Sequence, residues 1–250
     1  MELPPTTEPS SDYRTRIYAT YASQFQRSNL RFDAAAAARW GRTFKKYSEG
    51  WLPQRKDAAI LDLACGNGYL LYFFKQEGYT KITGVDISPE QVALSRQVVP
   101  DVIEGSILDV LENHHERFDL ITGIDIIEHL KKDEVLRFLD AAVGALRPGG
   151  RLVLQTPNAD SPMIGTLRYG DFTHEVIFNQ NSLGSLLTLA GLRRIEAREQ
   201  GPVPHGIVSF SRYCLWALLR RCLWFWNLVE TGAPGSGIFT RVFIISGIKE

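Results

Sequence analysis

Apolar and polar residues alternate along the first half of the chain in blocks that predict a strand, a helix and a second strand. Residues 60–64 form an apolar run that only Asp62 interrupts, and residues 69–76 have the character of a helix. Residues 81–85 form a second strand-like run that stops at Asp86. Apolar runs of this length, bounded by turn residues, are typical of parallel strands buried on both faces. This order therefore predicts a βαβ unit.

The turn between the first strand and the helix carries the first candidate chemistry. Gly66 and Gly68 lie in this turn, where the backbone must approach a neighbour closely or adopt a positive φ. Gly68 and Asp86 are 18 positions apart, which suits a βαβ unit whose second strand ends in an acid that binds ribose hydroxyls. These spacings predict a nucleoside site, although a glycine turn alone is also common for structural reasons.

The glycine pattern discriminates between nucleosides. A dinucleotide fold places a third glycine where this chain has Leu71, so a nicotinamide-dependent oxidoreductase is disfavoured. Asp62 would repel a pyrophosphate but suits a ligand that carries an ammonium group. The set of Asp62, Gly66, Gly68 and Asp86 resembles the first two motifs of class I S-adenosylmethionine-dependent methyltransferases.

Three later segments resemble the same family in order, namely residues 104–107, 118–130 and 146–154. The resemblance implies an α/β fold with a Rossmann-like sheet of seven strands, helices on both faces, and a last strand that is antiparallel and inserted beside the fifth. It also implies S-adenosylmethionine as the cofactor. The cofactor-binding residues that it implies are Asp62, Ala64, Cys65, Gly66, Asn67, Gly68, Asp86, Ile87, Ser106, Ile107, Asp125 and Tyr21.

Candidate catalytic residues follow the predicted fourth and fifth strands, where the acceptor of a methyl group would bind in this fold. His174 and His129 are candidates for the base that removes a hydroxyl proton, against the simpler roles of fixing a loop or starting a helix. Asp125, Glu128 and His129 also resemble an acid-x-x-Glu-His cluster of ubiquinone-pathway O-methyltransferases that can gather a divalent cation. Aspartate in place of the usual glutamate shortens the reach, so a metal is not expected.

Composition bounds the remaining possibilities. A chain of 250 residues with 44% hydrophobic residues can bury one full core. Its formal net charge of zero argues against nucleic acid as the main substrate. The three cysteines lack metal-ligand spacing, and the polar start of the chain has no apolar signal segment, so we expect a cytoplasmic protein.

We expect three regions along the chain. Residues 1–11 are predicted to be a disordered tail, and residues 12–55 a helical lid from which Tyr18 and Tyr21 face the cofactor. Residues 56–250 form the methyltransferase domain, with a last strand near residues 237–247 and a helical insert at about residues 200–237.

The insert contains an unusual helix at residues 207–229, rich in tryptophan, phenylalanine and leucine but interrupted by three arginines. It is too charged to span a bilayer. Three alternatives remain open: the helix packs on its own domain, it makes a peripheral membrane contact, or it forms a homodimer. In the second case the protein would be membrane-associated.

These features favour a methyltransferase that acts on a hydroxyl of a small molecule or a glycan. An N- or C-methyltransferase of a secondary metabolite, which would not need His174, is the alternative enzyme. A non-catalytic partner subunit that binds through the insert is the alternative from another class, but it would not need the intact glycines and both acids.

Overall fold

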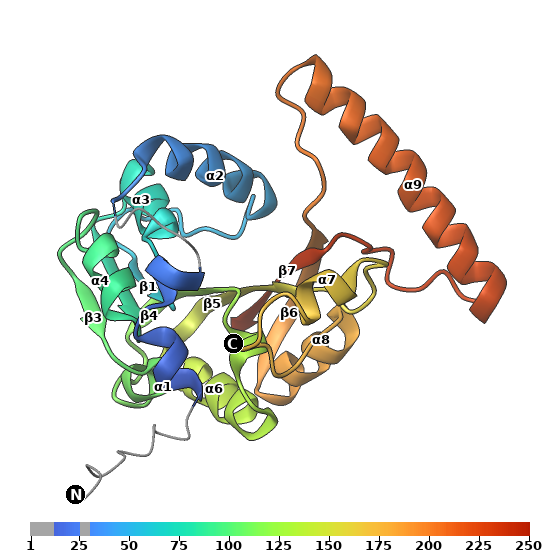
Figure 1. Cartoon of the computed structure of the whole chain (residues 1–250). Helices are drawn as coiled ribbons and strands as arrows, with labels where there is room; N and C mark the ends of the chain where they lie inside the picture. The colour runs from blue at the N-terminus through green and yellow to red at the C-terminus, as the bar shows by residue number, and fades with distance from the viewer. Residues whose placement is uncertain (1–12, 26–30) are drawn as a thin grey trace, which may run out of the picture.

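The computed structural model describes residues 13–25 and 31–250, and its centre is a seven-stranded sheet in the order β3-β2-β1-β4-β5-β7-β6 (Figure 1). The predicted tail at residues 1–11 lies outside the described residues. The strands are β1 (Ala59–Leu63), β2 (Lys81–Asp86), β3 (Val102–Glu104), β4 (Phe118–Ile124), β5 (Leu146–Pro157), β6 (Leu192–Glu199) and β7 (Val242–Lys249).

Strands β1 to β5 are parallel, and β7 runs antiparallel to both of its neighbours, β5 and β6. The predicted fold is therefore confirmed, including the insertion of the last strand beside the fifth. Parallel strands joined by helices place their carboxyl ends along one edge of the sheet, where ligands bind in folds of this kind.

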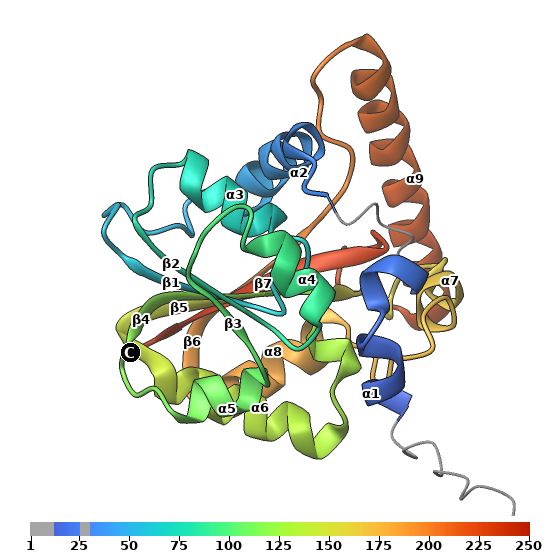
Figure 2. The same cartoon turned by 60° about the vertical axis from the view of Figure 1, so that its left-hand side comes forward.

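Helices cover both faces of the sheet, because β1 sends alternate apolar side chains to opposite sides (Figure 2). Ile60 packs into one core with Phe44 and Phe74, while Leu61 packs into the other with Phe138. The first face carries α2 (Ala34–Tyr47), α3 (Tyr69–Gln76) and α4 (Pro89–Ser95). The second carries α5 (Ile107–Glu112), α6 (Lys132–Ala145) and α8 (Gln180–Leu189).

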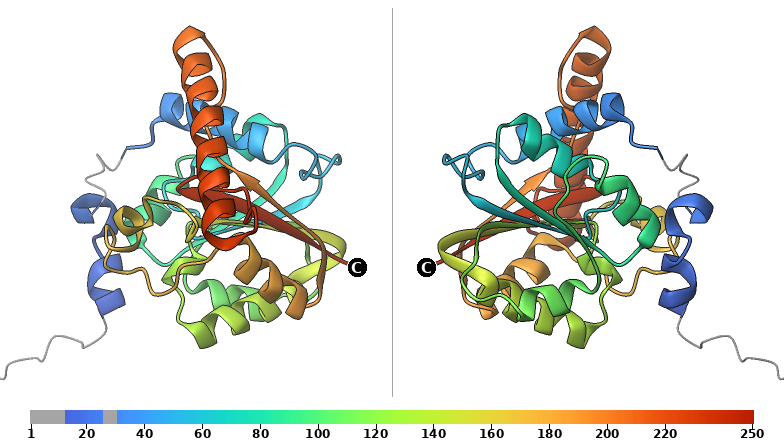
Figure 3. Two further views of the ribbon diagram at one scale, coloured as in Figure 1. Left: turned by 90° about the vertical axis from the view of Figure 1, so that its right-hand side faces the viewer. Right: turned by 90° about the vertical axis from the view of Figure 1, so that its left-hand side faces the viewer.

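The predicted lid consists of two parts with different positions. α2 packs on α3, where Phe44 meets Phe73 edge to face at 5.3 Å between ring centroids. α1 (Tyr13–Tyr18) and the π-helical turn η1 (Tyr21–Phe25) instead lie at the edge of the sheet (Figure 3). This second part supplies Arg14, Tyr18 and Tyr21 to the lining of the cavity described below, whereas α2 supplies Trp40.

The last strand begins later than predicted. It starts at Val242, and the apolar residues Ile238 and Phe239 precede it as buried irregular backbone. The amide of Asn158 explains this, since its Nδ2 donates to the carbonyls of Ile238, at 2.9 Å, and Thr240, at 3.0 Å. These two carbonyls therefore accept hydrogen bonds from a side chain in place of the backbone hydrogen bonds that would continue the strand.

The insert forms one helix, α9 (Ile207–Thr231), that stands away from the sheet (Figures 1 and 3). Ser209 is its one buried residue. The helix contacts its own domain along one side, where Trp216 and Arg220 bond to Glu199, and exposes most of its remaining surface. Among residues 13–25 and 31–250 we find no helix with the length and hydrophobicity to span a bilayer.

Candidate functional site

A cavity of about 1030 Å³ opens at the carboxyl ends of β1, β2 and β4 and is closed on one side by α1, η1 and α7 (Ile164–Arg168). Most of the residues predicted for the site line it. These are Tyr21, Ala64, Gly66, Asn67, Asp86, Ile87, Ser106, Ile107, Asp125, Glu128, His129 and His174. The cavity has room for a cofactor and an acceptor together.

Asp86 organises the cofactor side of the cavity. Its Oδ2 accepts a hydrogen bond from the backbone N–H of Gly66 at 2.9 Å, and its Oδ1 accepts one from that of Ser88 at 2.8 Å. Burial raises the pKa of Asp86, and these two N–H groups act in the opposite direction. The carboxylate thus joins the glycine turn to the end of β2. A carboxylate held in this way can also accept hydrogen bonds from ribose hydroxyls, so the residues fit the predicted cofactor.

Three predicted residues do not line the cavity. Asp62 lies beneath the turn, where its Oδ1 accepts a hydrogen bond from Thr122 Oγ1 at 2.7 Å, so its carboxylate is not presented to a ligand ammonium. Cys65 is buried, and its Sγ donates to Ser95 Oγ at 3.5 Å. Gly68 is the N-cap of α3 and is not among the residues that line the cavity.

The two glycines of the turn have different roles. Both have positive φ, +53° at Gly66 and +82° at Gly68. A Cβ at Gly66 would meet nothing closer than 3.9 Å, whereas one at Gly68 would lie 3.1 Å from Ser95 Cα on α4. Gly68, which the resemblance implies as a cofactor-binding residue, does not line the cavity, and its lack of a side chain instead lets α4 pack on the turn.

Strained backbone also marks the site. Ala64 and Asp125 have φ of +50° and +53°, a region that costs non-glycine residues about 1–2 kcal/mol. Both follow the last residue of a central strand and line the cavity. No sequence signal predicts this strain, but it is typical of functional sites.

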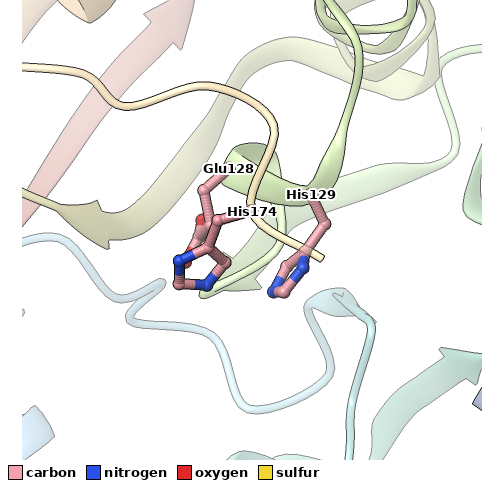
Figure 4. Close-up of side chains that lie close together, drawn as sticks. All are labelled: Glu128, His129 and His174. Atoms are coloured by element: carbon pink, nitrogen blue, oxygen red, sulfur yellow. The ribbon is translucent and has the colours of Figure 1, made fainter. Parts of the chain in front are cut away.

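Glu128, His129 and His174 converge on the acceptor side of the cavity (Figure 4). One donor atom from each lies within 4.8 Å of the others. Glu128 is fully buried; its Oε2 accepts a hydrogen bond from Thr156 Oγ1 at 3.0 Å, and its Oε1 has no partner among the described residues. Burial raises the pKa of Glu128 well above its usual range, with further help from Asp125.

Hydrogen bonds fix the tautomers of both histidines. His174 Nδ1 lies 2.8 Å from the carbonyl of Leu167, which can only accept, so Nδ1 carries the proton. Thr173 Oγ1 donates to Asp171 Oδ1 at 2.6 Å and therefore accepts from His129 Nδ1, 2.8 Å away. In both rings Nε2 is left with a lone pair. The two rings stand edge to face, 4.8 Å apart.

The predicted metal cluster of Asp125, Glu128 and His129 does not assemble as such. Gln155 Nε2 donates to both carboxylate oxygens of Asp125 at 3.0 Å. His174 lies beside Glu128 and His129 instead. These three could hold a divalent cation, but bonds of about 2.1 Å place donors no more than about 4.2 Å apart. The trio would have to contract to bind one.

Sequence reasoning missed the contacts that join the lid to this trio. Arg14 forms an ion pair with Glu134 at 2.8 Å and donates to the carbonyl of His129 at 2.7 Å. Tyr21 Oη donates to Asp171 Oδ2 at 2.8 Å. Burial opposes ionisation of Asp171, but hydrogen bonds from Thr173 and Tyr21 outweigh it and lower the pKa. Asp171 is thus a charged anchor for His129 and for the lid.

Known proteins match this chain over its central region. A family model described as a methyltransferase domain matches residues 32–197. A small RNA 2′-O-methyltransferase from Mus musculus is 32% identical over 46% of this chain and 33% of its own length. A ubiquinone biosynthesis O-methyltransferase from Xylella fastidiosa is 30% identical over 40% of this chain and 42% of its own length. The chain thus spans less than half the length of these relatives.

Solved structures share the whole fold. A SAM-dependent methyltransferase from Archaeoglobus fulgidus superposes with a TM-score of 0.64 at 19% identity, over 95% of this chain and 100% of that one. At this identity the likeness concerns the fold alone. The family model covers more than half of the chain, and the sheet order and the Asp86 turn agree with it. The chain belongs to the methyltransferase domain family, of the class I S-adenosylmethionine-dependent type.

Proposed function

We propose that this chain transfers a methyl group from S-adenosylmethionine to a hydroxyl of a small molecule or a glycan. The observation that carries the proposal is the pair of Nε2 lone pairs on His129 and His174, which line the same cavity as Asp86. A hydroxyl must lose its proton as it attacks, whereas an amine brings its own lone pair. Two histidines held in the accepting tautomer favour a hydroxyl acceptor.

On the cofactor side, bound S-adenosylmethionine supplies an activated methyl group on a positively charged sulfur. Asp86 accepts hydrogen bonds from the ribose hydroxyls, and the backbone at Gly66 and Asn67 approaches the cofactor closely. Ser106 and Ile107, at the start of α5, lie at the edge of the adenine. The enzyme's main task is then to align the acceptor and to exclude water.

On the acceptor side, His174 Nε2 removes the hydroxyl proton. Burial, with a smaller contribution from the nearby His174, lowers the pKa of His129 to about 4. Such a ring stays neutral but is a weak base at neutral pH, so His129 orients the hydroxyl by accepting a hydrogen bond. Thr173 and Asp171 keep His129 in the tautomer that this role requires.

The charge of the cavity opposes an anionic acceptor. Arg14 is the one arginine or lysine among the described residues that line the cavity, and it is paired with Glu134, while Asp86, Asp125, Glu128 and Asp171 add carboxyl groups to the lining. An RNA 2′-hydroxyl, suggested by the name of the mouse relative, would bring phosphates to a protein with zero net charge. The histidine pair suits either hydroxyl, but the charge favours a small molecule or a glycan.

A methyl-transfer assay tests the proposal. The purified chain would be incubated with S-adenosylmethionine labelled in its methyl group and with phenols, sugar nucleotides, secondary amines or RNA with a free 3′ end. Mass spectrometry and NMR would then locate the label. We expect the label on a hydroxyl oxygen of a phenol or a sugar. Label on nitrogen or carbon only, or on RNA only, would overturn the proposed acceptor.

A further inference from the structure

α9 exposes an unusual amount of apolar surface. Eleven large apolar residues of this helix are at least 43% exposed. They are Ile207, Val208, Phe210, Tyr213, Leu215, Leu218, Leu219, Trp224, Phe225, Trp226 and Val229. A large exposed apolar surface marks a site of interaction with a partner or a membrane.

Five of these exposed residues form an outer stripe along one side of the helix. Val208, Leu215, Leu218, Phe225 and Val229 are separated by three, four or seven positions, so they share one side. The opposite side faces the domain, where Trp216 Nε1 donates to Glu199 Oε2 at 3.3 Å and Arg220 forms an ion pair with the same carboxylate. The domain thus holds α9 by one side and leaves the outer stripe uncovered.

Positive charge flanks this outer stripe. With 3.6 residues per turn, Arg212 lies about 40° to one side of Val208 and Arg221 about 40° to the other side of Phe225, so the two arginines lie on opposite flanks of the stripe. No acidic partner is found for either arginine among the described residues. Residues 207–229 contain no aspartate or glutamate, and Glu230 is the first acid of the helix. The stripe therefore presents apolar side chains between cationic edges.

A second apolar surface lies at the rim of the cavity. Met163, Tyr169 and Phe172, on either side of α7, are 57%, 85% and 80% exposed. The chain after α9 is tied to the same loop, because Ser236 Oγ donates to Asp160 Oδ2 at 2.8 Å. Figure 2 shows α7 beside the carboxyl-terminal part of α9, and in Figure 1 the segment that follows α9 runs between them. This segment therefore links the rim to the helix.

We propose that α9 and the α7 rim bind the surface of a membrane that contains anionic lipids. Aromatic and aliphatic side chains would enter the boundary between head groups and acyl chains, and Arg212 and Arg221 would meet anionic head groups. A second copy of the chain would cover the stripe but offers no acids to the flanking arginines from its own residues 207–229. The lipid surface accounts for both apolar surfaces and for the charge.

Flotation of the full chain with vesicles tests this proposal. We expect the protein to float with vesicles made of equal parts phosphatidylglycerol and phosphatidylcholine. The double variant Leu218→Glu/Phe225→Glu should stay at the bottom, because both side chains lie in the outer stripe. The pair Arg212→Gln/Arg221→Gln should lower the partition coefficient about 25-fold, since each basic residue near an anionic surface contributes roughly fivefold.

The matched control is Leu189→Glu, which places a charge on an equally exposed apolar residue of α8. This variant should float like the parent chain. All variants should retain the parent thermal midpoint and affinity for S-adenosylhomocysteine, because the altered side chains are exposed. Failure of the parent chain to float would overturn the proposal, as would flotation that the Leu218→Glu/Phe225→Glu change leaves intact.

Light scattering without vesicles tests whether a second copy of the chain, instead of a membrane, covers the stripe. A mass of twice 28.2 kDa that falls to the monomer in Leu218→Glu/Phe225→Glu, together with no flotation, would assign the stripe to a second copy and overturn membrane binding. These measurements are independent of the methyl acceptor, so the membrane proposal and the proposed reaction can fail separately.

Discussion

The two walls of the cavity differ in how far apart their residues lie along the chain. On the cofactor wall, Gly66 and Asp86 are joined by a hydrogen bond that spans 20 residues, and Asp86 bonds Ser88 two residues later. On the acceptor wall, Tyr21 reaches Asp171 across 150 residues and Thr173 reaches His129 across 44. The first wall comes from one continuous βαβ unit, whereas the second wall is assembled from segments that are far apart in the sequence.

This difference separates binding from catalysis. We expect the cofactor wall to be the more rigid of the two, because its residues lie at the ends of strands buried on both faces. The acceptor wall combines the ends of β4 and β5 with α1, η1 and the loop around α7. Substitutions on the acceptor wall should therefore lower kcat and leave the affinity for the cofactor nearly unchanged. Substitutions on the cofactor wall should weaken the binding of the cofactor first. These two expectations test the comparison.

The largest effect is expected on the acceptor wall. His174→Ala should lower kcat about 10²- to 10⁴-fold, the usual loss for a general base, with the affinity for S-adenosylhomocysteine within twofold of the parent. Steady-state kinetics and calorimetry measure the two. His115→Ala, at an exposed position outside the cavity, is the matched control and should be silent. An equal loss for His129→Ala with none for His174→Ala would move the base to His129.

Treatment with EDTA distinguishes an imidazole base from a metal on the same side chains. We expect the rate to survive EDTA, because the donors of Glu128, His129 and His174 stand up to 4.8 Å apart and Asp125 is held by Gln155. A rate that EDTA abolishes and magnesium or manganese restores would assign these residues to a metal site instead.

The next effect belongs to the cofactor wall. Asp86→Ala should weaken binding of S-adenosylmethionine by about 2–4 kcal/mol, the scale of lost charge-assisted hydrogen bonds, because the ribose loses its acceptor and the Gly66 turn its anchor. Isothermal calorimetry on the purified chain measures it. Unchanged affinity, or tighter binding of NAD than of S-adenosylhomocysteine, would contradict the role of Asp86.

The same contrast explains what could be predicted from the sequence. The fold and most of the cofactor wall follow from short spacings, because a strand, a turn and a helix fix Gly66 and Asp86 relative to each other. His129 and His174 could be proposed individually, but their common target depends on the position of the loop after β5. The roles of Arg14 and Asp171 were not predictable, since their partners are distant in sequence. Gly68 was misassigned because a glycine pattern does not reveal which side of the turn α4 occupies.

Asp62 is buried beneath the cofactor wall, and its burial should make the stability of the protein depend on pH. Burial, and to a lesser extent the charge of Asp86, raises the pKa of Asp62 to about 7, although the hydrogen bond from Thr122 opposes this. In the unfolded chain the pKa is near 3.9. The folded state thus holds a proton that the unfolded state releases, so stability falls as the pH rises from about 4 to 7 and is constant above that range.

Asp62→Asn keeps the shape and the acceptor for Thr122 but removes this titration. We expect the variant to be more stable than the parent at pH 8, by a few kcal/mol at most, and to lose the advantage near pH 4. Urea unfolding at both values measures it. A difference between the two chains that does not change with pH would show that Asp62 is not protonated in the folded state.

The smallest effect separates the two glycines of the cofactor turn. Gly68→Ala should lower the free energy of unfolding by about 1–3 kcal/mol, because its Cβ would lie 3.1 Å from Ser95 on α4 and its φ is +82°. A Cβ at Gly66 would have open space beside it, so Gly66→Ala should lower the free energy of unfolding by only about 1 kcal/mol, the cost of a positive φ for alanine. Gly66→Ala should nevertheless weaken cofactor binding, because Gly66 lines the cavity. Urea unfolding and calorimetry on the two variants compare these losses. If Gly68→Ala proved as stable as the parent, α4 would not depend on the turn, and the cofactor wall would be less rigid than the comparison with the acceptor wall requires.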